Sequence, residues 1–62
     1  MLCKQAKLKS DNFHMVTWVE SQIKTGDSIK FKNDERWWKV ENTYQYEVEK
    51  ANINYSWKVG GL

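Results

Sequence analysis

Apolar and polar residues alternate strictly through the stretch Ser28-Ile29-Lys30-Phe31-Lys32, and the alternation resumes in Trp38-Lys39-Val40-Glu41. Successive side chains of a β-strand point to opposite faces, so a period of two predicts two half-buried strands. Between them lies the polar run from Asn33 to Arg36, whose residues are typical of turns. If this run forms a tight turn, Phe31 lies opposite Trp38 and Ile29 opposite Val40. The stretch therefore predicts a β-hairpin with an apolar inner face.

The same alternation continues downstream to residue 49 and again from Ile53 to Val59. Asn42 interrupts the first of these segments, which indicates one long strand with an irregularity or two strands joined by a bend. A second hairpin, turning at residues 50–53, would again bring apolar residues opposite one another: Val48 and Tyr55, Tyr46 and Trp57, Tyr44 and Val59. The side chains expected to point inward are Ile29, Phe31, Trp38, Val40, Tyr46, Val48, Tyr55 and Trp57.

Two further strands are predicted upstream, from Leu2 to Leu8 and from Phe13 to Val19, joined by the turn-forming residues 10–12. The second of these strands is apolar on both faces, and such a strand lies either in the centre of a sheet or at an interface. The connection that follows is long enough for one helical turn, in which Gly26 would supply a positive φ. Ile23 is expected to fill the end of the barrel.

A chain of 62 residues is too short to build two hydrophobic cores, so a single domain over residues 1–62 is expected. About five short strands and no long helix predict an all-β fold. We expect a small five-stranded antiparallel barrel, SH3-like or OB-like, or a curved sheet. At most one helical turn is expected, near residues 20–25.

The composition excludes several classes of protein. A hydrophobic content of 40% with 15% aromatic residues is too high for a disordered tail. No apolar run approaches the roughly 18 residues of a membrane span and no secretory signal is recognisable, so we expect a cytoplasmic protein with no membrane partner. Cys3 has no second cysteine to pair with, and with His14 as the single histidine no metal site is expected.

Few residues are suited to covalent or acid–base chemistry. Cys3 has no partner implied by its spacing, and His14 lies in an apolar strand. Glu47 and Glu49 share a strand face but are interpreted as solvated charges. The three glycines do not fit a nucleotide-binding fingerprint. We therefore predict that the protein is not an enzyme and takes no cofactor and no small-molecule substrate.

The favoured prediction is a non-catalytic interaction module that forms a homodimer. The strand from residue 13 to residue 19 carries more apolar side chains than one interior can accept, and twofold contacts commonly cover such a surplus. If Phe13, Met15 and Val19 point inward, Val16 and Trp18 are left for a partner, whereas the opposite assignment leaves Phe13 and Met15. The candidate interface residues are Phe13, His14, Met15, Val16 and Trp18.

The alternative prediction is a small barrel that binds single-stranded nucleic acid. Such barrels stack bases on aromatic side chains bordered by basic residues. The candidate binding patch is Lys30, Lys32, Arg36, Trp37 and Lys39. A net charge of only +2 weighs against this alternative, because dedicated nucleic-acid domains usually carry a larger excess of positive charge.

The segment Thr17-Trp18-Val19-Glu20, the later Gly26 and the run Trp38-Lys39-Val40 resemble a pattern in short phage-encoded proteins. Those proteins carry Thr-Trp-Ile/Val-Pro-Glu, a glycine several residues later and a Trp-x-Val strand, and the resemblance spans residues 16–44. Glu20 stands where the pattern has proline. The resemblance implies a phage accessory product of the host cytoplasm that binds and inhibits a host protein, including proteins of defence systems.

Overall fold

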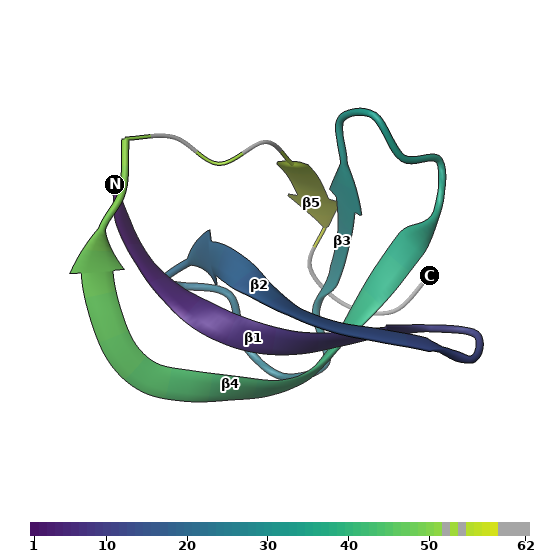
Figure 1. Cartoon of the computed structure of the whole chain (residues 1–62), viewed down its shortest axis with the longest axis horizontal. Helices are drawn as coiled ribbons and strands as arrows, with labels where there is room; N and C mark the ends of the chain where they lie inside the picture. The colour runs from purple at the N-terminus through teal and green to yellow at the C-terminus, as the bar shows by residue number, and fades with distance from the viewer. Residues whose placement is uncertain (52, 54, 59–62) are drawn as a thin grey trace.

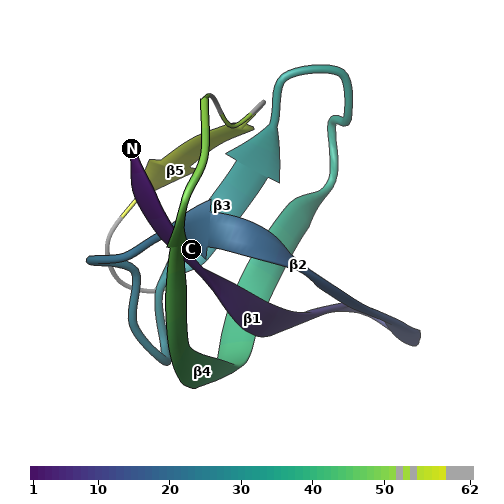
Figure 2. The same ribbon diagram turned by 60° about the vertical axis from the view of Figure 1, so that its left-hand side comes forward.

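The computed structural model describes residues 1–51, 53 and 55–58. They form one antiparallel sheet with the strand order β2-β1-β4-β3-β5, which curls strongly into a half-barrel (Figures 1 and 2). The strands are β1 (Leu2–Ser10), β2 (Phe13–Glu20), β3 (Ser28–Phe31), β4 (Trp37–Glu49) and β5 (Tyr55–Lys58). The predicted all-β class is confirmed, and the described residues contain no helix.

The hairpin predicted at the start of the chain is present. β1 and β2 pair with Ser10 opposite Phe13, so the turn consists of Asp11 and Asn12. Asp11 has a φ of 53°, in the left-handed region that aspartate tolerates better than most residues. Within the described residues β2 pairs with β1 alone, so β2 is an edge strand, and of the two positions that the sequence left open the central one is excluded.

The hairpin of β3 and β4 is confirmed, but its predicted register is wrong by two residues. Ile29 lies opposite Trp38 rather than Val40. Asp34 organises the connecting loop: its carboxylate accepts hydrogen bonds from the Arg36 N–H at 2.9 Å and the Trp38 indole N–H at 3.2 Å. A shift of two residues keeps every side chain on its predicted face.

The long strand β4 is continuous and bent, as one of the two interpretations of Asn42 anticipated. Lys4 lies opposite Glu47 but Ala6 lies opposite Thr43, so β4 contains two more residues than β1 over this interval. Extra residues of this kind bend a strand and turn its side chains aside. Tyr46 is 75% exposed as a result, and its predicted inward position is wrong.

The predicted pairing of the last strand is wrong. β5 pairs with β3, which places Tyr55 opposite Phe31 and Trp57 opposite Ile29, and it does not follow β4 in a hairpin. The rings of Phe31 and Tyr55 meet edge to face, with centroids 6.4 Å apart. Val59, expected opposite Tyr44, lies outside the described residues.

The core fills the concave side of the sheet and comes from β1 to β4 and the connection between β2 and β3. Ile23 is fully buried, as predicted, and the connection after Glu20 has turns at residues 21–22 and 25–26 and no helical turn. Gly26 has the expected positive φ, at 98°. Phe31 and Tyr55 pack against the core while remaining partly exposed. The buried cluster consists of Ala6, Leu8, Val19, Ile23, Ile29, Trp38 and Val40.

Candidate interaction site

The free edge of β2 is one of the two outer edges of the described sheet. A two-residue turn makes Ser10 and Phe13 a hydrogen-bonded pair, so odd-numbered residues of β2 direct their backbone N–H and C=O groups toward β1. Consistent with this alternation, the Ser21 N–H donates to the Leu2 carbonyl at 3.0 Å. Even-numbered residues must therefore direct these groups away from the sheet.

The last even-numbered residue of β2 shows this outward direction. The Glu20 N–H donates to the phenol oxygen of Tyr55 at 2.9 Å, across the open side of the half-barrel. Within the described residues, the backbone groups of His14, Val16 and Trp18 face the same open side with no strand beside them. We call these three residues the β2 edge.

The side chains of β2 divide between its two faces. Met15 packs against the core and Val19 is buried, so the odd-numbered residues point inward. Val16 points outward and is 52% exposed. Phe13 is the first residue of β2 and is 56% exposed. Of the two assignments left open by the sequence, the structure has the one that leaves Val16 and Trp18 outside the core.

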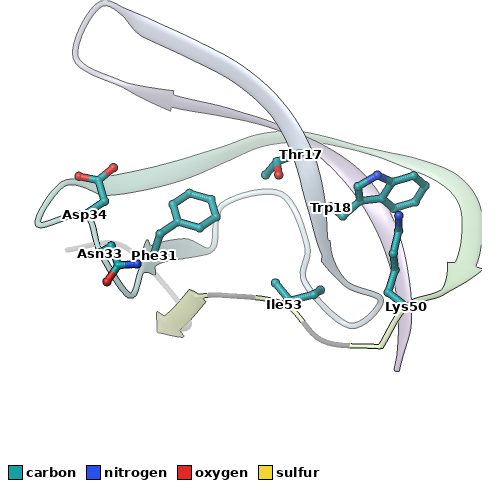
Figure 3. Close-up of a pocket in the computed structure, with 7 residues that line it drawn as sticks. All are labelled: Thr17, Trp18, Phe31, Asn33, Asp34, Lys50 and Ile53. Atoms are coloured by element: carbon teal, nitrogen blue, oxygen red, sulfur yellow. The ribbon is translucent and has the colours of Figure 1, made fainter.

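A groove borders this edge on the open side of the half-barrel (Figure 3). It encloses about 470 Å³ and is lined by Thr17, Trp18, Phe31, Asn33, Asp34, Lys50 and Ile53. The Lys50 ammonium lies 4.3 Å from the centre of the Trp18 ring, a cation–π contact that covers one side of the indole. Figure 3 shows Asp34 at the opposite end of the groove from Lys50. The groove is thus apolar at its centre and carries opposite charges at its two ends.

Hydrogen bonding favours the ionised form of the carboxyl group at one end of this groove. The backbone N–H of Arg36 and then the indole of Trp38 donate to Asp34, and these bonds hold the pKa of Asp34 below its usual 3.8. At the outer face of the β2 edge, the His14 ring nitrogen Nδ1 lies 3.5 Å from the Glu41 carboxylate. The side chain of His14 is 49% exposed and that of Glu41 is 34% exposed.

The candidate nucleic-acid patch is divided by the fold. Lys30 lies opposite Trp37 on the outer face, with its ammonium 6.0 Å from the indole centre. Lys39 belongs to the same face of β4. Arg36 instead stacks 4.4 Å over the ring of Phe13, and Lys32 is exposed in the loop.

The structure places one lysine of the N-terminal strand beside this patch. Lys9 of β1 lies directly opposite Lys39 of β4. No local pattern could have placed it there, because β1 and β4 are far apart in the sequence. Lys9, Trp37 and Lys39 line a second hollow of about 320 Å³, which Asp11 also lines.

The carboxylates considered for catalysis have separate partners. Glu47 accepts a hydrogen bond from the Ser21 hydroxyl, and Glu49 forms an ion pair with the amino group of Met1. In the part of the chain that the structure describes, no three His, Cys, Asp or Glu side chains are close enough together to hold a metal ion. The same part contains no helix long and apolar enough to cross a membrane.

Comparison with protein-family models, with curated proteins and with solved structures finds no match to this chain. The function is therefore argued from the geometry of the candidate site.

Proposed function

We propose that the protein is a non-catalytic interaction module that binds another polypeptide by adding a strand to the β2 edge. The observation that carries this proposal is the row of outward-facing backbone N–H and C=O groups at His14, Val16 and Trp18. An extended peptide gains main-chain hydrogen bonds from such a row, and neighbouring side chains determine which peptide fits.

The composition of β2 supports this proposal. Soluble proteins usually protect an exposed edge strand with charged residues, proline or a bulge. From Phe13 to Val19 there is no lysine, arginine, aspartate, glutamate or proline, although 29% of the chain is charged. β2 also pairs with β1 in unbroken register from Phe13 to Glu20. An unprotected and regular edge is suited to pairing with another strand.

The biological role that we propose follows the resemblance to phage accessory proteins. The partner would be a host protein, such as a component of a defence system, and the module would act in the host cytoplasm by occupying a surface that the partner needs. The groove beside the β2 edge would accept side chains from the inward face of the added strand. No cofactor, metal or small-molecule substrate takes part in this mechanism.

We also propose that the half-barrel is a small barrel of the SH3-like or OB-like kind. The bend in β4 supports this assignment, because it lets one strand pair with β3 at its start and with β1 along the rest of its length. In such barrels a strongly bent strand commonly belongs to both halves of the sheet.

The proposal is tested by placing a photo-crosslinking amino acid at Val16 and irradiating bacterial cells that express the protein. We expect covalent adducts with a second polypeptide, whose crosslinked peptide mass spectrometry identifies as an extended segment. Tyr46 provides the matched control position, because it is 75% exposed and belongs to β4. Adducts formed equally at both positions, or at neither, would refute binding at the β2 edge.

A second candidate function is binding of single-stranded nucleic acid on the outer face. The observation that favours it is the direct opposition of Lys9 and Lys39, because like charges at facing strand positions destabilise a sheet unless an anion compensates them. Trp37 beside Lys30 would stack a base. If so, Trp37→Ala weakens oligonucleotide binding by about 1 to 3 kcal/mol and the affinity falls steeply with salt. Failure of wild-type protein to bind oligonucleotides at low salt would exclude this function.

A further inference from the structure

We propose that a second copy of this chain occupies the β2 edge, so that two β2 strands pair antiparallel about a twofold axis at Val16. This inference rests on the proposed function of the edge and states what covers the edge before a host partner binds. Closed twofold contacts use the same surface on both copies, so the edge must be complementary to itself. The backbone directions and the side chains of β2 meet that requirement in one particular register.

The backbone selects the register. Only His14, Val16 and Trp18 offer both an N–H and a C=O group on the free side, so these residues must face one another across the axis. An axis at Val16 pairs Val16 with its own copy and His14 with Trp18 of the second copy. All three residues then form hydrogen-bonded pairs, each exchanging two bonds.

Other registers use fewer of these groups. An axis shifted toward Trp18 brings Glu20 into the pairing, but the Glu20 N–H already donates to the phenol oxygen of Tyr55. An axis shifted toward His14 brings in Asn12, which belongs to the hairpin turn and not to the strand. The hydrogen bond to Tyr55 and the turn thus limit the pairing segment at its two ends.

The side chains are compatible with the Val16 register on both faces. The outer face pairs Val16 with its copy and His14 with the indole of Trp18, and Val16 is 52% exposed in the single chain. The inner face pairs Met15 with Thr17 of the second copy. No pair brings like charges together, because β2 has no lysine, arginine or carboxylate before Glu20. Facing apolar and aromatic pairs of this kind stabilise antiparallel strands.

Pairing of the two edges has a consequence for the proposed partner. It joins two five-stranded sheets into one continuous sheet and removes both free β2 edges from solvent. A host chain would need the same backbone groups, so self-pairing and partner binding exclude each other. The dimer therefore protects the edge until a partner displaces one copy.

The mass of the particle gives the first test. We expect sedimentation equilibrium at micromolar concentration to give twice the chain mass of 7.4 kDa, and the Val16→Lys variant to give 7.4 kDa. Val16 is outside the core, so this variant should keep the far-UV spectrum of the wild type. The matched control Tyr46→Lys makes the same kind of change on exposed β4 and should remain dimeric.

Disulfide trapping tests the register. Facing residues of a hydrogen-bonded pair have Cα atoms about 5.5 Å apart, which a disulfide can span. Val16→Cys should therefore crosslink to itself on mild oxidation, whereas Tyr46→Cys should not. His14→Cys and Trp18→Cys should crosslink when mixed but not separately. Native Cys3 is buried, and peptide mapping by mass spectrometry distinguishes it from the introduced thiol.

The outcomes separate this inference from the proposed function. A wild-type mass of 7.4 kDa throughout the micromolar range would overturn the second copy as partner. A dimer in which Val16→Cys does not crosslink would overturn the Val16 register. In either case, retained photo-crosslinking at Val16 to a different chain would leave binding at the β2 edge intact, and its loss would remove both proposals.

Discussion

The phenol oxygen of Tyr55 lies 2.9 Å from the backbone nitrogen of Glu20 and accepts its hydrogen bond. The two residues belong to β5 and β2, which stand at opposite ends of the strand order. This side-chain contact links the two ends of the sheet across the open side of the half-barrel. Burial of the phenol raises the pKa of Tyr55 well above its usual 10.

Replacing Tyr55 by phenylalanine should weaken this link between β5 and β2. The Glu20 N–H would lose its acceptor while the edge-to-face contact with Phe31 could remain. We expect a loss of about 1 kcal/mol in the free energy of unfolding, and a fall of roughly 4–8 °C in Tm for a domain of this size. Differential scanning calorimetry measures this change. Tyr46→Phe, which alters an exposed phenol, should leave Tm unchanged, and equal effects from both variants would contradict the role of Tyr55.

Alkaline pH should weaken the same link between β5 and β2. Because the folded state raises the pKa of Tyr55 above 10, the neutral phenol stabilises the fold fully below pH 10, and this contribution is lost as pH rises beyond that value. We expect the difference in unfolding free energy between wild type and Tyr55→Phe to shrink above pH 10. Denaturant titrations of the two proteins at matched pH values measure it. A difference that is constant with pH would show that ionisation of Tyr55 is not linked to unfolding.

Acid should act on the loop between β3 and β4. The folded state lowers the pKa of Asp34 below 3.8, so the hydrogen bonds to its carboxylate stabilise the fold above that pH. This stabilisation is lost as the pH falls further and the carboxylate becomes protonated. The advantage of the wild type over Asp34→Ala should therefore decrease when pH is lowered through this range. The indole N–H resonance of Trp38 should shift over the same interval in NMR spectra. An indole resonance that does not respond to acid would refute this linkage.

Trp38 should be essential to the fold. Its side chain is 6% exposed and belongs to the buried cluster. Trp38→Ala should cost about 3 to 5 kcal/mol, which is comparable to the total stability of roughly 3 to 9 kcal/mol expected for a chain of this length. Far-UV circular dichroism should show a largely unfolded variant. Trp37→Ala, on the outer face, is the matched control and should stay folded. A folded Trp38→Ala protein would place this residue outside the core.

The thiol of Cys3 should be unreactive in the folded protein. It is fully buried, and burial raises its pKa, so little of the nucleophilic thiolate is available. If labelling requires global unfolding, even 3 kcal/mol of stability slows it by more than about a hundredfold. The Tyr46→Cys variant supplies an exposed thiol in the same molecule as an internal reference. Equal labelling rates for the two thiols would show that β1 opens readily.

Local pattern predicted the parts of the fold that depend on neighbouring residues. The period of two located β1, β2, β3 and most of β4, and turn-forming residues located the first hairpin. It could not place β5, because Tyr55 has the parity to face either Val48 on β4 or Phe31 on β3. The bend in β4 turns the second half of that strand away from β5. Tyr55 of β5 contacts the ring of Phe31 on β3 instead.

The candidate site was predictable in the same limited sense. Two apolar faces predicted an interface at β2, because such a pattern exceeds the needs of one interior. Its position at an edge follows from the pairing of β1 with β4, and the position of Lys9 opposite Lys39 follows from the same pairing. These residues meet only in the folded chain, so spacing along the sequence does not reveal them.

The central position of β4 also determines the order in which the chain can fold. The β1–β2 hairpin closes through neighbouring residues, but its remaining edge must wait for β4, since Leu2 pairs with Glu49. Pairing between distant segments is slow because the intervening chain must first be ordered. During synthesis, the first hairpin would stay open on both sides until residue 49 leaves the ribosome. A translational pause before that point would therefore lengthen the period in which two nascent chains can associate through the wrong edge.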